Sequence, residues 1–304
     1  MTDAVISGID HILIRVEHLE PLFSTLTEVF GLPSPWPLST HSAFTSVGVS
    51  LGNVDLELVR FGKSIERRPN TRLYGIAFEP NAPTLMESQR VLQRRGIPHS
   101  SVVPYIRRNE NGNPEHLWDS LYVGGLLGGN LWQKIFFAST KFLPNRFLAR
   151  TSDSDVSAVL DRVFPHGMTF LVDYDPAFAE NFEREEARRK FDTRNGGPLG
   201  VVGLREIVIG TKHTDAARDR WSDLLWPVAE STPNRWRFDD GLGIRLVSQS
   251  NDGFVGLVVE VESLDQAKAL LATHDMVGNV SESSVTIAPS TLAGVDIRLV
   301  ESAN

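Results

Sequence analysis

The sequence predicts an α+β protein in which one unit, a strand, a helix and then further strands, occurs four times and is divided between two domains. The first observation behind this prediction is recurrence, because strand-like and helical runs return in the same order along the chain. The second is the cluster Asn195-Gly196-Gly197-Pro198, which interrupts the pattern and is typical of a domain boundary. We therefore expect domains at residues 1–195 and 196–304.

The first unit begins with residues 8–16, which are rich in β-branched side chains and alternate with period two. This alternation places His11, Leu13 and Arg15 on one face of a strand. Apolar residues then recur at helical spacing over residues 19–30, and a glycine follows where a helix would end. A strand followed by a helix is therefore expected.

A hairpin completes the first unit. Residues 43–51 and 54–61 are both strand-like, and they are separated by Gly52-Asn53, a dipeptide suited to a tight turn. A weaker strand pattern precedes them near residues 37–42.

The later units follow the same order. Further strands are expected at residues 73–79, 100–106, 117–137, 202–209, 243–247, 255–261 and 295–300. Helices are expected at residues 84–95, 215–225 and 264–274. An insertion at residues 139–198 is expected to hold a helical stretch at 153–164, a strand at 168–174 and a connecting helix at 180–190.

The composition indicates a packed globular protein and excludes several kinds of site. Of 304 residues, 41% are hydrophobic and 22% are charged, close to the average for globular domains. The absence of cysteine excludes disulfides, thiolate metal sites and cysteine nucleophiles. A net charge of −8 argues against a broad nucleic-acid surface. Since neither a membrane-spanning run nor a signal peptide is evident, we expect a cytoplasmic protein.

Three short segments carry a family resemblance. Ile9-Asp10-His11-Ile12 precedes a helix, Val54-Asp55-Leu56-Glu57-Leu58-Val59 ends the first unit, and Phe170-Leu171-Val172-Asp173-Tyr174 lies in the insertion. In this order and spacing they resemble the vicinal oxygen chelate superfamily of glyoxalases, bleomycin resistance proteins and extradiol dioxygenases, and most closely its glyoxalase-like domain. The likeness covers nearly the whole chain and implies four βαβββ modules that form two incomplete barrels.

The resemblance also implies where a divalent metal ion would bind, because the family holds it with residues from the first and last strands of two modules. The first-strand positions are occupied by His11, Gly75, Glu206 and Gly256. The last-strand positions are occupied by Glu57, by Asp173 or Gln133, by Arg245 and by Arg298.

In the first domain the expected metal ligands are His11 and Glu57, with Asp173 or Gln133 as the third. An imidazole and carboxylates suit Zn, Mn, Fe or Ni. Glu57 would also be the catalytic residue, as a proton acceptor. The structural alternative is a hydrogen-bonded strand histidine beside a Glu57 carboxylate paired with Arg15.

In the second domain arginine cannot coordinate a metal and glycine offers no side chain. This domain is expected to be structural, with Glu206 paired to Arg245 or Arg298. A substrate pocket in the first domain is expected to include Arg15, Trp118 and Tyr122.

Aromatic pocket walls are expected where Trp118, Tyr122, Trp132 and Phe136 fall in a sheet of the first domain. Such residues are also the ordinary content of a core.

Two functions remain open. One is a metal-dependent lyase, isomerase or dioxygenase for a small substrate with vicinal oxygens, with ring cleavage disfavoured by Glu206, Gly256 and Arg298. The other is a metal-free protein that binds or sequesters a small molecule. The expected partner is a small-molecule ligand, and a homodimer is possible in either case.

Overall fold

The computed structural model describes residues 3–41, 43–62, 72–108, 111–142 and 155–302. Their strands form two eight-stranded mixed sheets, so the protein is of the α+β class. The first sheet comprises β1 (Ile6–Arg15), β2 (Ser39–Thr40), β3 (Phe44–Ser50), β4 (Asp55–Phe61), β5 (Arg72–Pro80), β6 (Val103–Arg108), β7 (Pro114–Val123) and β8 (Met168–Tyr174). Its order is β2-β3-β4-β1-β5-β8-β7-β6.

The second sheet has the same order of neighbours, β10-β11-β12-β9-β13-β16-β15-β14. It comprises β9 (Val201–Thr211), β10 (Glu230–Thr232), β11 (Arg235–Arg237), β12 (Gly243–Ser248), β13 (Gly253–Val261), β14 (Val277–Val280), β15 (Ser284–Ile287) and β16 (Ile297–Glu301). In both sheets the central pair, β1·β5 or β9·β13, is antiparallel, and each member has a parallel neighbour on its other side.

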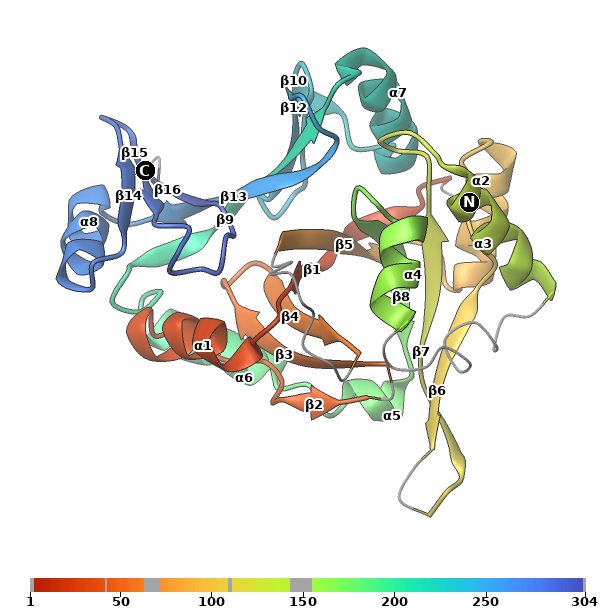
Figure 1. Ribbon diagram of the computed structural model, residues 1–304, viewed down its shortest axis with the longest axis horizontal. Helices are drawn as coiled ribbons and strands as arrows, with labels where there is room; N and C mark the ends of the chain where they lie inside the picture. The colour runs from red at the N-terminus through yellow and green to blue at the C-terminus, as the bar shows by residue number, and fades with distance from the viewer. Residues whose placement is uncertain (1–2, 42, 63–71, 109–110, 143–154, 303–304) are drawn as a thin grey trace.

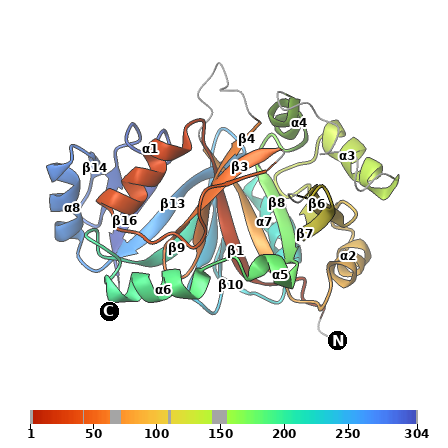
Figure 2. The same ribbon diagram turned by 90° about the horizontal axis from the view of Figure 1, so that it is seen from below.

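Helices connect the strands of both sheets. They are α1 (Leu19–Ser24), the π-helical η1 (Thr25–Val29), α2 (Leu85–Arg94), α3 (Leu131–Phe142), α4 (Asp155–Val163), α5 (Pro176–Ala179), α6 (Arg184–Thr193), α7 (Thr214–Leu225) and α8 (Leu264–Thr273). Figures 1 and 2 show α2, α3 and α4 at one end and α1, α6 and α8 at the opposite end. No helix of the described residues is both long and apolar enough to cross a membrane.

The two faces of the first sheet have different environments. Alternate residues such as Ile12, Ile14 and Leu56 join a large buried cluster that also contains residues of the second sheet, and Phe78 packs against Phe238 with ring centroids 6.5 Å apart. The opposite face belongs to a separate buried cluster shared with α3 and α4. This second face carries the candidate site.

The hairpin predicted at Gly52-Asn53 is present, and it also joins the sheets. Gly52 adopts a φ of +88°, which a residue without a Cβ reaches freely. The side chain of Asn53 donates to the Leu204 carbonyl (2.9 Å) and accepts from the Leu204 amide (2.8 Å). It thus completes both hydrogen bonds of a residue at the start of the second sheet.

One predicted strand is wrong over part of its length. Residues 117–123 are in β7, but the chain then leaves the sheet at a glycine-rich stretch and forms α3 from Leu131. Asn130 starts the helix by accepting a hydrogen bond from the Gln133 amide at 2.7 Å, as an N-cap residue does. Consequently Trp132 and Phe136 lie on a helix, where Trp132 is exposed and Phe136 is buried.

Candidate functional site

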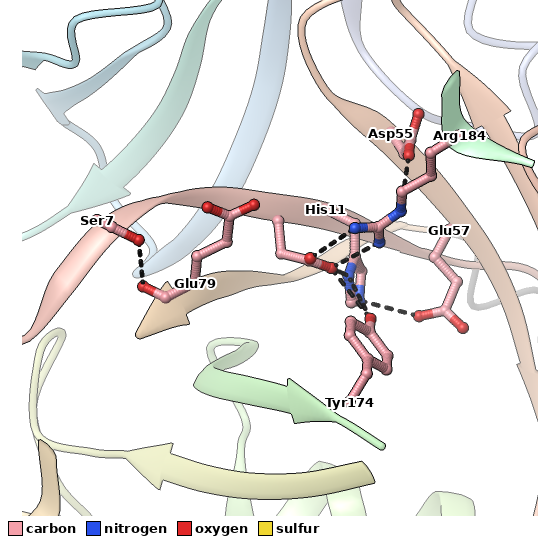
Figure 3. A network of polar contacts seen from close by, with 8 residues as sticks. Ser7, His11, Asp55, Glu57, Glu79, Tyr174 and Arg184 are labelled. Atoms are coloured by element: carbon pink, nitrogen blue, oxygen red, sulfur yellow. Dashed lines mark hydrogen bonds and ion pairs between the residues drawn. The ribbon is translucent and has the colours of Figure 1, made fainter. Parts of the chain in front are cut away.

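The centre of the site is a contact between β1 and β4, which run side by side in parallel. His11 is opposite Asp55 and Leu13 is opposite Glu57 in the register of these strands. The side chains of His11 and Glu57 both point to the face covered by α3 and α4, and His11 Nε2 lies 3.2 Å from Glu57 Oε2 (Figure 3). The family resemblance predicted that these two residues would both bind a metal ion. In the structure they form a direct ion pair with each other.

Asp10 holds the other nitrogen of His11. Neighbouring strand residues normally point to opposite faces, but the register of β1 against β5 shifts between Ile9 and His11, as in a β-bulge. The Asp10 and His11 side chains meet here, with Oδ1 2.5 Å from Nδ1. Tyr174, at the end of β8, donates its hydroxyl to the same oxygen at 3.0 Å.

The protonation of this line of groups follows from its pairing. Burial alone would lower the pKa of His11, but hydrogen bonds to Asp10 and Glu57 and their charges raise it to about 9. Burial alone would raise the pKa of both Asp10 and Glu57, but the bonded histidine lowers both, and Asp10 falls well below its usual range. At neutral pH the site therefore contains an imidazolium between two carboxylates.

Arg184, the first residue of α6, closes one end of the site. Its guanidinium donates two hydrogen bonds to Asp10, at 2.8 and 2.9 Å, and its Nε lies 3.4 Å from Asp55 Oδ2. Burial raises the pKa of Asp55, although the nearby arginine acts against this. The guanidinium carbon also lies within 6 Å of the ring centroids of Trp36 and Tyr174, at 5.7 and 5.6 Å.

A cavity of about 130 Å³ opens in front of His11 and Glu57. Most of its wall is made of aromatic and aliphatic side chains. The lining residues are His11, Leu13, Trp36, Ser39, His41, Phe44, Ser46, Glu57, Val59, Phe61, Trp118, Ser120, Tyr122, Met168, Phe170, Val172, Tyr174, Phe178 and Phe182.

The rings of the wall support one another. Trp118 is stacked on Tyr105 with centroids 4.2 Å apart and planes inclined by 4°. His41 is stacked on Phe44 at 4.6 Å, and burial lowers its pKa, so it adds a neutral ring to the wall. The cavity therefore has flat aromatic sides suited to an apolar ring.

Two of the three predicted pocket residues, Trp118 and Tyr122, line the cavity, and Arg15 does not. Arg15 is buried beyond the cavity, where it donates to Asp161 (2.8 Å) and to Ser157. The alternative pairing of Glu57 with Arg15 is therefore replaced by the pair with His11.

Neither candidate for a third metal ligand lies at the site. Asp173 is an exposed residue of β8, next to Tyr174, whose ring does line the cavity. Gln133 is buried in α3, where its side-chain oxygen accepts a hydrogen bond from the Gly125 amide at 3.1 Å. Both residues were predicted as ligands from sequence patterns, and such patterns do not determine which way a side chain points.

The register of the second sheet identifies the correct equivalent. In the second sheet Arg298 pairs with Val258, which lies two residues after Gly256. In the first sheet Phe170 pairs with Ala77, which lies two residues after Gly75. The third position is therefore Phe170, whose ring centroid lies 6.0 Å from that of His11. A Cβ on Gly75 would lie 2.6 Å from the Met168 carbonyl oxygen, so that position has no room for a ligand either.

These donors do not fit the divalent metal ion that the family resemblance implies. His11 and Glu57 supply two ligand atoms, while phenylalanine and glycine occupy the remaining positions. Within the described part of the chain, no group of three or more His, Asp or Glu side chains could hold an ion. Catalytic metal sites ordinarily have three protein ligands.

The second sheet replaces the same pair by another. Glu206 is opposite Gly243 in β12, as His11 is opposite Asp55 in β4, and Arg245 follows at the position equivalent to Glu57. Arg245 Nε lies 2.8 Å from one oxygen of Glu206, which confirms the predicted pair. Arg235, which was not expected, lies 2.6 Å from the other oxygen.

Several site residues were missed in the sequence. Trp36, Phe178, Phe182 and Arg184 belong to connecting segments whose position relative to the sheet has no periodic signal. Asp10 had one available signal, because it adjoins the histidine singled out by the family resemblance.

Comparison with solved structures shows the type of fold. A hypothetical protein from Staphylococcus aureus matches with a TM-score of 0.54 and 11% identity over 97% of this chain and 98% of that one. Homoprotocatechuate 2,3-dioxygenase from Brevibacterium fuscum matches with a TM-score of 0.55 and 11% identity over 100% and 83%. The Arthrobacter globiformis dioxygenase gives 0.54 and 12% over 98% and 80%.

The fold is thus consistent with the vicinal oxygen chelate type. No protein-family model and no curated protein sequence matches the chain.

Proposed function

We propose that this protein binds a small, largely apolar organic molecule in the cavity of the first sheet, without a metal ion. The observation that carries the proposal is that a largely aromatic cavity has a charged end, where the His11 imidazolium and the Glu57 carboxylate are already paired at 3.2 Å. Such a site has the common form of a small-molecule pocket, with apolar walls and few convergent polar groups.

The metal-free form is supported by the ligand positions. Phe170 and Gly75 replace two possible ligands, and His11 Nε2 is directed at a carboxylate. Asp10 does hold His11 as a carboxylate behind a metal-bound histidine would, but the same contact keeps a strand histidine in place without any ion.

A second candidate is a metal-independent isomerase or lyase in which Glu57 accepts a proton from the bound molecule. The line from Asp10 through His11 to Glu57 favours it, because the histidine keeps this carboxylate ionised inside an apolar cavity. Product formation on mixing with a candidate substrate would distinguish this enzyme from a binding protein.

We further propose that residues 1–195 carry the pocket and that residues 196–304 support it. Every lining residue precedes position 195, and the turns at residues 194–200 separate α6 from β9.

The first test is elemental analysis of protein purified without chelator, before and after incubation with Zn, Mn, Fe and Ni salts. His11→Ala and Glu57→Ala are analysed beside the wild type, and Asp173→Asn serves as a control that removes a carboxylate outside the cavity. We expect much less than one metal ion per chain in all four proteins.

Small aromatic compounds such as indole and quinoline are then titrated in, with quenching of the cavity tryptophans Trp36 and Trp118 as the signal. Binding should be unchanged by a chelator. One ion per chain, retained by Asp173→Asn and lost from both alanine variants, would overturn the metal-free proposal.

A further inference from the structure

The charged side chains that line the cavity differ in whether they are already paired. Among the described residues that line it, Glu57 is the one carboxylate, and neither lysine nor arginine is present. The imidazolium of His11 is engaged on both nitrogens, by Asp10 at 2.5 Å and by Glu57 at 3.2 Å. The cationic group at the polar end is therefore already paired.

Glu57 retains capacity to accept. A carboxylate offers about four lone-pair directions, and the hydrogen bonds from His11 and from the Ser46 hydroxyl use two of them. Its side chain is 16% exposed toward the cavity side of the sheet. A molecule that fills the cavity removes water from this carboxylate and must replace that water by a hydrogen-bond donor or a positive charge.

The surrounding rings select between a neutral donor and a positive charge. The faces of tryptophan, tyrosine and phenylalanine attract cations held within about 6 Å of the ring centroid. This wall already shows such a contact, because the Arg184 guanidinium carbon lies 5.7, 5.6 and 5.2 Å from the centroids of Trp36, Tyr174 and Phe182. Each of these rings also lines the cavity.

The charge of the connected network points the same way. Asp10, Asp55 and Glu57 face two cationic side chains, His11 and Arg184, so the carboxyl groups are in excess by one. The chain as a whole carries a net charge of −8, which favours the approach of cations over anions.

From these contacts we infer that the pocket takes an organic cation, an ammonium or amidinium group on an apolar body of one or two rings, with its charge between Glu57 and the aromatic wall. This inference deepens the proposed function and rests on it. The charged group lies at the polar end, and the apolar body lies among rings such as Phe44, Trp118 and Phe170.

The test compares three probes that share a benzene ring and differ in charge. Phenyltrimethylammonium, its neutral isostere tert-butylbenzene and the anion phenylacetate are titrated into the wild-type protein, with tryptophan quenching as the signal. We expect the cation to bind about tenfold or more tighter than the isostere, since cation–π and carboxylate contacts of this kind contribute at least one decade in affinity. Phenylacetate should bind most weakly.

Two variants locate the charge. Glu57→Gln keeps the size of the side chain and removes its charge, so it should abolish most of the preference for the cation while leaving tert-butylbenzene within about twofold. Asp173→Asn makes the same change in net charge outside the cavity and should leave the preference intact.

Equal binding of cation and isostere, or tighter binding of phenylacetate, would overturn the inference and leave the proposed binding function standing. Absence of binding by all three probes, together with the failure of indole and quinoline, would overturn both. These comparisons are made on the wild-type protein, so they hold even where Glu57→Gln does not fold.

Discussion

Arg184 and Asp10 are 174 residues apart in the chain and are joined by two hydrogen bonds of 2.8 and 2.9 Å. The side chain of Asp10 is 4% exposed and that of Arg184 is 31% exposed, so a buried carboxylate is paired with a partly exposed arginine. Through Asp10, a helix that follows the first sheet fixes the histidine on the first strand. The site is therefore a chain of four side chains, Arg184, Asp10, His11 and Glu57, each of which contacts the next.

Removing the arginine tests this chain. Arg184→Gln should reduce the free energy of unfolding by about 3 kcal/mol, because it leaves a buried carboxylate with one cationic partner fewer. Urea denaturation followed by circular dichroism measures the change. Arg189→Gln, on the same helix with its side chain 75% exposed, should change stability by less than about 0.5 kcal/mol. Equal effects of both substitutions would contradict the role given to Arg184.

The raised pKa of His11 predicts how stability varies with pH. Because its pKa rises from 6.5 to about 9 on folding, the native state binds the proton more tightly than the unfolded state. This contribution is complete below about pH 6.5 and is lost as the pH rises through about 9, and its size is on the order of 3 kcal/mol.

Urea midpoints measured between pH 6 and 10 should therefore fall more steeply in the wild type than in His11→Gln. His274→Gln, at an exposed histidine after α8, should keep the wild-type slope. A His11→Gln variant with the full slope would assign the effect to another group.

Gly75 provides a test of close packing between β5 and β8. Gly75→Ala should lower the free energy of unfolding by about 1 to 3 kcal/mol, because the new Cβ would lie 2.6 Å from the Met168 carbonyl oxygen and must push the strands apart. In Gly8→Ala, on β1, the nearest atom is a side-chain oxygen at 3.5 Å, so this control should be nearly neutral. Thermal unfolding distinguishes the two, and a neutral Gly75→Ala would refute the packing argument.

Asn53 tests the connection between the sheets. Asn53→Asp replaces the amide that donates to the Leu204 carbonyl by an acceptor, so it should reduce stability by about 1 to 3 kcal/mol. Asn279→Asp makes the same chemical change at an exposed position of β14 and is the matched control. If both variants unfold at the same urea concentration, the Asn53 contact is not a significant link.

The sequence predicted much of the secondary structure because periodicity reports burial. Alternation placed His11 and Leu13 on one face of β1, and both line the cavity. The strand at residues 168–174 and the turn at Gly52-Asn53 are also confirmed. The count of four βαβββ modules and the two domains remain predictions.

The site was less predictable because it depends on register and on connecting segments. A shift of one residue decides whether Asp173 or its neighbours face the cavity, and the family motif alone does not fix that shift. The β-bulge before His11 and the contact of Arg184 with Asp10 both depend on tertiary packing, and neither has a local sequence pattern. The predicted strand at residues 117–137 also included Gln133, which lies in α3. Asn130 before it is a residue type that favours the N-cap of a helix.

The cavity residues all precede the second sheet in the sequence, so they are synthesised first. All side chains that line the cavity, and Arg184 behind them, are synthesised before β9 begins at Val201. Phe78 lies on the face of the first sheet that packs against the second sheet. This face stays uncovered until the strands of the second sheet, which end with β16 at Glu301, have been synthesised. The incomplete chain therefore exposes apolar surface at a stage when all cavity residues have already been synthesised, and a molecule that bound the cavity at that stage would stabilise the incomplete protein.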